Sequence, residues 1–169
     1  MKQAHIQQSM ESSILIQASA SEIWDNITDV KIEEFSDPIL FKLLDIPKPL
    51  KADVISEGKG GQRIAYFDSG KRFMQEILRW EPMTGYSFSF NPEKGFRVCY
   101  LFDLADGVFQ IPGGAYRLDS MHKQAIRLTL QTTFSIDRRL YWLFILPVKL
   151  ILKAFQRYLL RSIKRNSEP

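Results

Sequence analysis

Residues 62–90 read QRIAYFDSGKRFMQEILRWEPMTGYSFSF, and this stretch decides the fold. β-branched and aromatic residues fill two runs, at 62–67 and 72–80, which is typical of strands. The segment DSG at 68–70 separates them and is typical of a hairpin connection. A third run, 85–90, alternates strictly between larger and smaller side chains, which is the period of a strand. Three strands joined by short connections predict an antiparallel sheet.

The strand pattern continues on both sides of this stretch. Further strands are predicted at 12–17, 52–56, 97–104, 115–121 and 125–136. Over residues 20–27 the pattern becomes helical, because apolar residues recur on one face. Ser19 or Ser21 can cap this helix, and Glu22 stands where a capping box with Ser19 requires it.

Two more helical regions complete the prediction. Residues 29–44 favour one or two short helices divided at Asp37-Pro38, since a residue before proline avoids the α region. A long helix is predicted from about 139 to 165. Strands that follow one another without intervening helices indicate an α+β fold, with a curved antiparallel sheet wrapped around the long C-terminal helix. We expect residues 1–169 to form a single domain and residues 1–9 to be a flexible tail.

The composition narrows the class of protein. The chain has 169 residues, 45% of them hydrophobic, and a net charge of +4. Its single cysteine, Cys99, excludes an internal disulfide and a Cys-rich metal site, and suits a cytoplasmic protein. No secretory signal is expected at 1–8, and the apolar run 140–146 is too short to span a membrane. No cofactor motif is present, because the glycine loops at 58–62 and 112–114 match neither a P-loop nor a dinucleotide fingerprint.

The order and spacing of several weak motifs point to one superfamily. The early strand is followed by Ala18-Ser19-Ala20-Ser21-Glu22-Ile23-Trp24-Asp25, and the middle hairpin carries Gly61-Gln62-Arg63, Gly70, Glu76 and Trp80-Glu81-Pro82. In these residues the chain resembles the START-like (SRPBCC) superfamily, in its polyketide cyclase/dehydrase-like branch. The resemblance implies a helix-grip fold with an interior cavity for apolar ligands. It implies no particular reaction, because one fold serves many functions.

The pair Arg63 and Glu76 is the most specific candidate site. If residues 69 and 70 form a two-residue turn, these two side chains face each other on a mostly apolar face of the sheet. The pair would then anchor a polar ligand group, with Glu76 as a candidate catalytic base, or it would be a structural ion pair. If the loop has three residues, Arg63 instead faces Gln75.

Aromatic residues supply the other candidate ligand contacts. Tyr86, Phe88 and Phe90 form a stripe that is either core or cavity wall. Tyr100 and Tyr116 lie on predicted strands and could direct hydroxyls into a cavity. The predicted ligand-binding residues are Arg63, Glu76, Phe88, Tyr100 and Tyr116. No metal site is predicted, because His5 and His122 have no metal-ligand companions nearby in the sequence.

The excess positive charge belongs to the last helix. Residues 138–169 carry eight basic residues and one acid, a net +7, so residues 1–137 carry −3. Lys149, Lys153, Arg157, Arg161 and Arg165 recur every four residues and form a basic stripe. The stripe is either a solvated face or a contact for an anionic membrane surface. The apolar segment 140–146 suits a cap over the cavity mouth, a membrane interface or a subunit contact.

Three functions remain open from these observations. The sequence favours a protein that binds a small hydrophobic or amphipathic ligand, lipid-like or polyketide-like, in an internal cavity. A cyclase/dehydratase-type enzyme acting on such a ligand is the first alternative. A membrane-surface-associated or self-associating protein is the second. Nucleic acid is not an expected partner, because residues 1–137 are net acidic and no recognised nucleic-acid motif is present.

Overall fold

A computed structural model describes residues 4–32, 39–68, 70–92, 94–100, 102–105, 107–121 and 125–169. The strands are β1 (His5–Ile16), β2 (Asp29–Lys31), β3 (Pro49–Val54), β4 (Gln62–Phe67), β5 (Arg72–Glu81), β6 (Gly85–Ser89), β7 (Arg97–Val98), β8 (Phe102–Asp103), β9 (Phe109–Ser120) and β10 (Ile126–Asp137). The helices are α1 (Ala20–Thr28), α2 (Ile39–Leu43) and α3 (Tyr141–Ser167).

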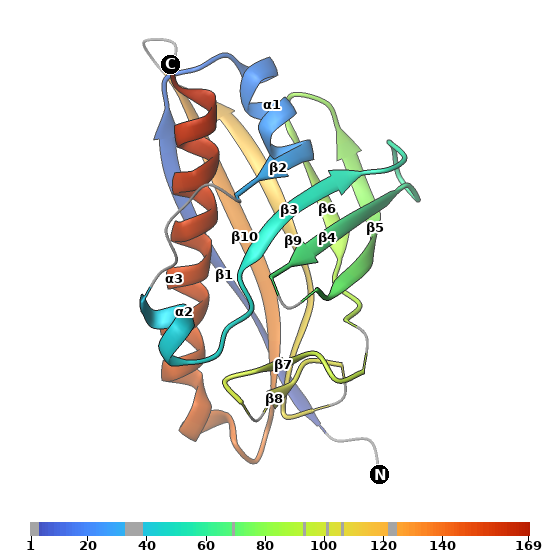
Figure 1. Ribbon diagram of the computed structural model, residues 1–169, viewed down its shortest axis with the longest axis vertical. Coiled ribbons are helices and arrows are strands. Elements are labelled where there is room, and N and C mark those ends of the chain that lie inside the picture. The colour runs from blue at the N-terminus through green and yellow to red at the C-terminus, as the bar shows by residue number, and fades with distance from the viewer. Residues whose placement is uncertain are drawn as a thin grey trace.

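Eight of the strands form one antiparallel sheet in the order β1-β10-β9-β6-β5-β4-β3-β2. The sheet curves, and α3 lies along it as a single long helix (Figure 1). This arrangement confirms the predicted α+β fold, in which a curled antiparallel sheet closes around the C-terminal helix. In the described ranges, no helix is long and apolar enough to cross a bilayer.

The first strand is longer than its sequence pattern predicts. β1 pairs with β10 along its whole length, from His5 opposite Asp137 to Ile16 opposite Ile126. Residues 5–9 are therefore part of the sheet, and the predicted flexible tail is wrong for them. The physical reason is that strand pairing uses the backbone, so the polar run Gln7-Gln8-Ser9 extends an edge strand that carries little hydrophobic pattern.

The segment after the first strand contains the predicted helix and an unpredicted strand. Ser19 caps α1: its Oγ accepts from the Glu22 N–H at 3.2 Å, and the Glu22 carboxylate accepts from the Ser19 N–H at 2.9 Å. The capping box is thus confirmed. Residues 29–31, predicted to be helical, instead form β2 against β3. The predicted boundary at Asp37-Pro38 lies outside the described residues.

The region 97–104 is not the continuous strand that the sequence predicts. β7 and β8 are two residues each, and they pair only with each other. Between them Cys99 and Tyr100 adopt left-handed backbone conformations, with φ of 53° and 62°. Residues other than glycine rarely adopt this conformation, so the composition of the segment gave no indication of a turn.

A buried glutamine fastens α3 to the sheet. Gln156 is fully buried. Its Nε2 donates to the Met10 carbonyl at 3.0 Å and to Thr132 Oγ1 at 2.9 Å. Its Oε1 accepts from Ser12 Oγ at 2.8 Å. These contacts join the middle of the helix to β1 and β10 at once, which fixes its position over the sheet.

The core has two parts. One lies beside α1, where Trp24 packs edge-on against Trp80 and Tyr86, and Tyr86 donates from its hydroxyl to the Ile27 carbonyl. The other lies between β3–β5 and the first half of α3, around Phe67 and Phe73. The candidate site lies where side chains from both parts meet α3.

Candidate functional site

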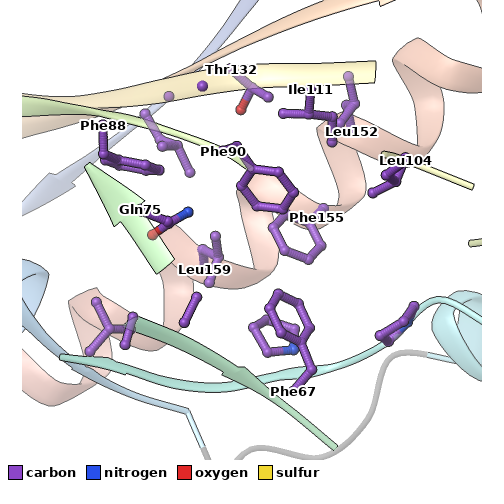
Figure 2. Close-up of a pocket in the computed structure, with 18 of the residues that line it drawn as sticks. Phe67, Gln75, Phe88, Phe90, Leu104, Ile111, Thr132, Leu152, Phe155 and Leu159 are labelled. Atoms are coloured by element: carbon purple, nitrogen blue, oxygen red, sulfur yellow. The ribbon is translucent and has the colours of Figure 1, made fainter. Parts of the chain in front are cut away.

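A pocket of about 150 Å³ lies between the sheet and α3. Figure 2 shows Phe90, Phe155 and Leu159 pointing into it, together with the Gln75 amide. The lining is mainly apolar and comes from strands β2–β7, β9 and β10, from the segments that flank them, and from α3. The α3 side chains that line it are Ile151, Leu152, Phe155 and Leu159. An apolar cavity of about 150 Å³ in another protein binds benzene, so the volume suits a ligand part of that size.

A second, smaller cavity of about 50 Å³ adjoins the first. The two share the lining residues Val98, Phe109, Ile151 and Leu152. The smaller cavity extends along α3 towards Phe144 and Val148, under the β7–β8 hairpin. The apolar space beside α3 is therefore longer than the main pocket alone.

Few polar side chains line the main pocket. They are Lys51, Arg63, Gln75, Tyr116 and Thr132. Lys51 forms an ion pair with Asp53 at 3.2 Å and is partly exposed. Thr132 is already hydrogen-bonded to Gln156. No carboxylate lines the pocket in the part of the chain that the structure describes.

The β4–β5 register places Arg63 opposite Gln75, not Glu76. The Phe67 N–H donates to the Lys71 carbonyl at 2.9 Å, and Tyr66 pairs with Arg72, so three residues, 68–70, separate the paired positions 67 and 71. Gly70 has a φ of 73°, a left-handed conformation. Three-residue hairpin loops typically end in a residue of this conformation, and glycine adopts it without strain. The primary prediction of an Arg63–Glu76 pair is therefore wrong, and the three-residue alternative is confirmed. A shift of one residue turns every β5 side chain to the other face.

The consequences of this shift are visible along β5. Phe73, Gln75 and Ile77 are buried, whereas Met74 and Glu76 are exposed. Glu76 thus lies on the outer face of the sheet, away from the pocket. It does not share a face with Arg63, as an acid/base pair would require.

Arg63 is a buried cation with a neutral partner. It is only 5% exposed, and its Nη1 donates to Gln75 Oε1 at 2.5 Å. Its guanidinium carbon lies 4.6 Å from the centre of the Phe88 ring. The buried Nε has no hydrogen-bond partner among the described residues, and none of their carboxylates forms an ion pair with Arg63. The guanidinium therefore retains capacity to bind an acceptor.

Two buried tyrosines lie near this cation. Burial raises the pKa of Tyr116, and the positive charge of Arg63 partly opposes the rise. Burial likewise raises the pKa of Tyr86 well above its ordinary value, with Arg63 again opposing. Both phenols therefore stay neutral at physiological pH. Tyr116 lines the pocket, whereas Tyr86 is core and binds the end of α1.

The structure brings together three of the five predicted ligand-binding residues. Arg63, Phe88 and Tyr116 all line the pocket. Glu76 faces away, and Tyr100 is 61% exposed in the turn between β7 and β8 and does not line the pocket. Their predicted roles as ligand contacts remain predictions that this geometry does not support.

Other residues considered from the sequence lie apart from the pocket. His5 Nε2 lies 3.3 Å from the Gly107 carbonyl, and His122 lies outside the described residues. Cys99 adjoins only the smaller cavity, and burial raises the pKa of its thiol, with Asp45 adding to the rise. In the described ranges no group of histidine, cysteine and acidic residues is arranged to hold a metal ion.

Sequence reasoning missed several lining residues. Gln75 was named only as the partner of Arg63 in the alternative, three-residue loop, and not as a ligand contact. The α3 side chains Ile151, Leu152, Phe155 and Leu159 lie on the face opposite the basic stripe, and that spacing was the available indication. Nothing in the sequence indicated that Thr132 lines a pocket, because threonine is common in strands.

Comparison of the sequence with protein-family models and with curated proteins finds no match. Comparison of the fold with solved structures finds many. Norcoclaurine synthase from Thalictrum flavum, in complex with dopamine and hydroxybenzaldehyde, has a TM-score of 0.55 at 12% identity, covering 95% of this chain and 86% of that one. The ZhuI aromatase/cyclase from Streptomyces sp. R1128 has a TM-score of 0.58 at 11% identity, covering 96% and 94%.

A third structure, Ara h 8.0201, has a TM-score of 0.56 at 12% identity, covering 94% of this chain and 95% of that one. Identities this low establish the fold and leave the activity open. The coverage is nearly complete in both directions, so the likeness extends over the whole sheet and α3. The chain therefore has the helix-grip fold that its resemblance to the START-like superfamily predicted.

Proposed function

We propose that this protein binds a small, largely apolar ligand that carries an anionic group, with the apolar part in the pocket and the anion on Arg63. The single observation that supports this most strongly is the buried guanidinium. It lines an apolar cavity, has Gln75 as a neutral partner and keeps its Nε unused.

The energetics of a buried charge favour an anionic ligand. Removing a cation from water is costly unless an opposite charge or several hydrogen bonds compensate. Gln75 offers one acceptor oxygen, and the Phe88 and Tyr86 rings add cation–π contacts. A carboxylate or a similar oxyanion would supply the missing charge, and its bonds to arginine are among the strongest in proteins.

The size and shape of the site agree with a ring-containing or short lipid-like ligand. The cavity accepts a part the size of one ring, and the adjoining smaller cavity extends the apolar space along α3. The fold offers a precedent, because the similar norcoclaurine synthase was solved with dopamine and hydroxybenzaldehyde.

Benzoate and benzyl alcohol form a matched pair of probes for the charge preference. Both carry one aromatic ring, but only benzoate is anionic. Titrations followed by protein NMR should show benzoate binding at least about tenfold more tightly, since a charge-assisted bond replaces a neutral one. Arg63→Met should abolish this preference, and the exposed Arg72→Met should keep it.

Ala65→Leu serves as an occlusion variant, because Ala65 lines the pocket and a larger side chain there would fill it. It should weaken both probes. Equal affinities for the two probes in the unmodified protein would overturn the anionic anchor. Binding that survives in the occlusion variant would show that the probes bind elsewhere. Native mass spectrometry of the purified protein would identify a retained ligand.

A cyclase/dehydratase-type enzyme is the alternative function. Proton transfer in this pocket would rest on the neutral Tyr116 phenol beside Arg63, because Glu76 is on the outer face. The described lining contains no carboxylate to act as a base, which favours binding over this reaction.

A further inference from the structure

The outer face of α3 carries large apolar side chains that the fold leaves uncovered. Trp142, Leu143, Leu146 and Leu150 are each more than 60% exposed. At 3.6 residues per turn they lie within an arc of about 100°. The pocket-lining side chains of α3 lie on the opposite side of the helix. A contiguous exposed apolar surface of this kind marks an interaction site.

Basic side chains share this arc and surround the apolar ones. Lys149, Lys153, Arg157 and Arg161 are all exposed, and by helical geometry they occupy nearly the same side of α3. Arg138 and Arg139 are exposed immediately before the helix begins. The helix, residues 141–167, contains no acidic residue. The face therefore carries most of its apolar residues over the first turns, with Lys149 among them, and basic residues beyond them.

We propose that this outer face of α3 docks on the surface of an anionic lipid bilayer. The apolar residues 142, 143, 146 and 150 enter the boundary between headgroups and acyl chains, where interfacial helices place their apolar side. Trp142 lies at the level that tryptophans favour in membranes. The surrounding lysines and arginines attract the negative surface, each adding to the affinity.

Charge decides between a membrane and a second copy of the chain. A symmetric dimer through this face would bring the same basic stripe against itself, because both subunits use the same surface. Like charges brought together oppose association, whereas an anionic surface complements them. Residues 138–169 carry a net +7 and the rest of the chain −3, so the whole molecule also tends to orient this side towards a negative surface.

Sedimentation with vesicles tests the proposal directly. The full chain is mixed with phosphatidylglycerol or phosphatidylcholine vesicles, at low and at high salt. We expect binding to phosphatidylglycerol at low salt, strong weakening at high salt, and little binding to phosphatidylcholine. Lys149→Gln/Lys153→Gln should weaken binding by about tenfold or more, since each lysine near an anionic surface contributes roughly a fivefold factor to the affinity.

The apolar contribution has its own variant and a spectroscopic readout. Trp142→Ala/Leu146→Ala should also reduce binding, because both side chains are exposed and their loss leaves the core intact. Trp142 emission should shift to shorter wavelength on binding, and Trp142→Phe should remove most of that shift while binding persists. Trp24 is buried, so its emission should change little.

Matched controls lie at exposed positions away from α3, in the loop between β3 and β4 and on the outer face of β5. Lys59→Gln/Arg72→Gln removes the same charge from exposed positions, and Met74→Ala/Leu78→Ala truncates two large apolar side chains that are each about half exposed. Both should bind vesicles almost as well as the unmodified protein. Failure to sediment with phosphatidylglycerol at low salt would overturn the proposal, as would equal losses in the controls. The oligomeric state is measured by sedimentation without vesicles. A dimer that becomes a monomer in Trp142→Ala/Leu146→Ala would overturn the proposal in favour of self-association. None of these outcomes depends on the ligand proposed for the pocket.

Discussion

Arg63 and Gln75 are cross-strand neighbours on β4 and β5, and the guanidinium of Arg63 donates to the Gln75 side-chain oxygen inside the pocket wall. Both side chains are at least 95% buried. Gln75 therefore supplies the hydrogen-bond acceptor of this buried cation, beside the cation–π contacts with Phe88 and Tyr86.

Gln75→Leu should lower the free energy of unfolding by about 1–3 kcal/mol, because it leaves a buried charge without its acceptor. Arg63→Met/Gln75→Leu should recover most of this loss, since an apolar pair of similar volume replaces the polar one. Urea denaturation measures both. Gln62→Leu, on the exposed face of the same hairpin, is the control and should change stability by no more than about 0.5 kcal/mol. A Gln75 variant as stable as this control would contradict the assignment.

The alkaline stability should depend on Tyr116. Its pKa is raised by burial, so above the ordinary tyrosine pKa of about 10 the unfolded chain loses this proton while the folded chain keeps it. The folded state then binds more protons, and stability falls as pH rises. Tyr116→Phe should make this fall shallower by up to about 1.4 kcal/mol per pH unit. Denaturation midpoints measured between neutral pH and pH of about 11 check it; an unchanged slope would show that Tyr116 does not contribute.

Two adjacent glycines of β9 should respond differently to substitution. A Cβ on Gly113 would lie 2.4 Å from the Phe88 carbonyl oxygen, so the β6 and β9 backbones must separate. A Cβ on Gly114 would lie 3.1 Å from the tip of the Phe88 ring and from the Gln131 carbonyl. Overpacking of this kind costs about 1–3 kcal/mol.

We therefore expect Gly113→Ala to be the more destabilising of the two. Gly114→Ala should cost less, because the Phe88 ring can move, but it should weaken ligand binding as the ring moves within the pocket. Thermal unfolding and a benzoate titration separate the two effects. Greater destabilisation by Gly114→Ala would contradict this order.

Gln156→Leu should destabilise the fold by about 2–3 kcal/mol. The substitution removes three hydrogen bonds that join α3 to β1 and β10, and it leaves their partners on the sheet to find other acceptors or donors. Lys153→Gln, one turn earlier on the exposed side, should have an effect within about 0.5 kcal/mol. Chemical denaturation provides the comparison, and equal effects would show that Gln156 does not fasten the helix.

The sequence predicted the elements better than their pairing. The strand predicted at 62–67 has the same first and last residues as β4, because the alternation of apolar and polar side chains is the period of a strand. The face of Glu76 could not be obtained that way, because it depended on whether the loop after Phe67 has two residues or three. β5 has apolar residues on both faces, with Met74 and Leu78 outside and Phe73 and Ile77 inside, so its pattern did not decide the register.

The residues of the candidate site could be predicted where the alternation of side chains along a strand showed which of them face inward. Phe88 belonged to an alternating stripe whose members were expected to face the core or a cavity. Tyr100 was placed wrongly because two successive left-handed residues broke the expected strand, and no glycine marked that turn. The long-range contacts of Gln156 were also beyond prediction, because they join segments more than 20 residues apart.

The fastening of α3 by Gln156 bears on the kinetics of ligand exchange. A helix held at its midpoint to two strands is a fixed wall, so we do not expect a ligand bound as proposed to leave by lifting α3 from the sheet. The other side of the pocket is built from the β7–β8 hairpin, whose strands pair only with each other, and from the segment that joins α2 to β3. If the protein binds a ligand as proposed, substitutions in β7 and β8 should therefore alter its dissociation rate, while the preference for an anionic group should still depend on Arg63.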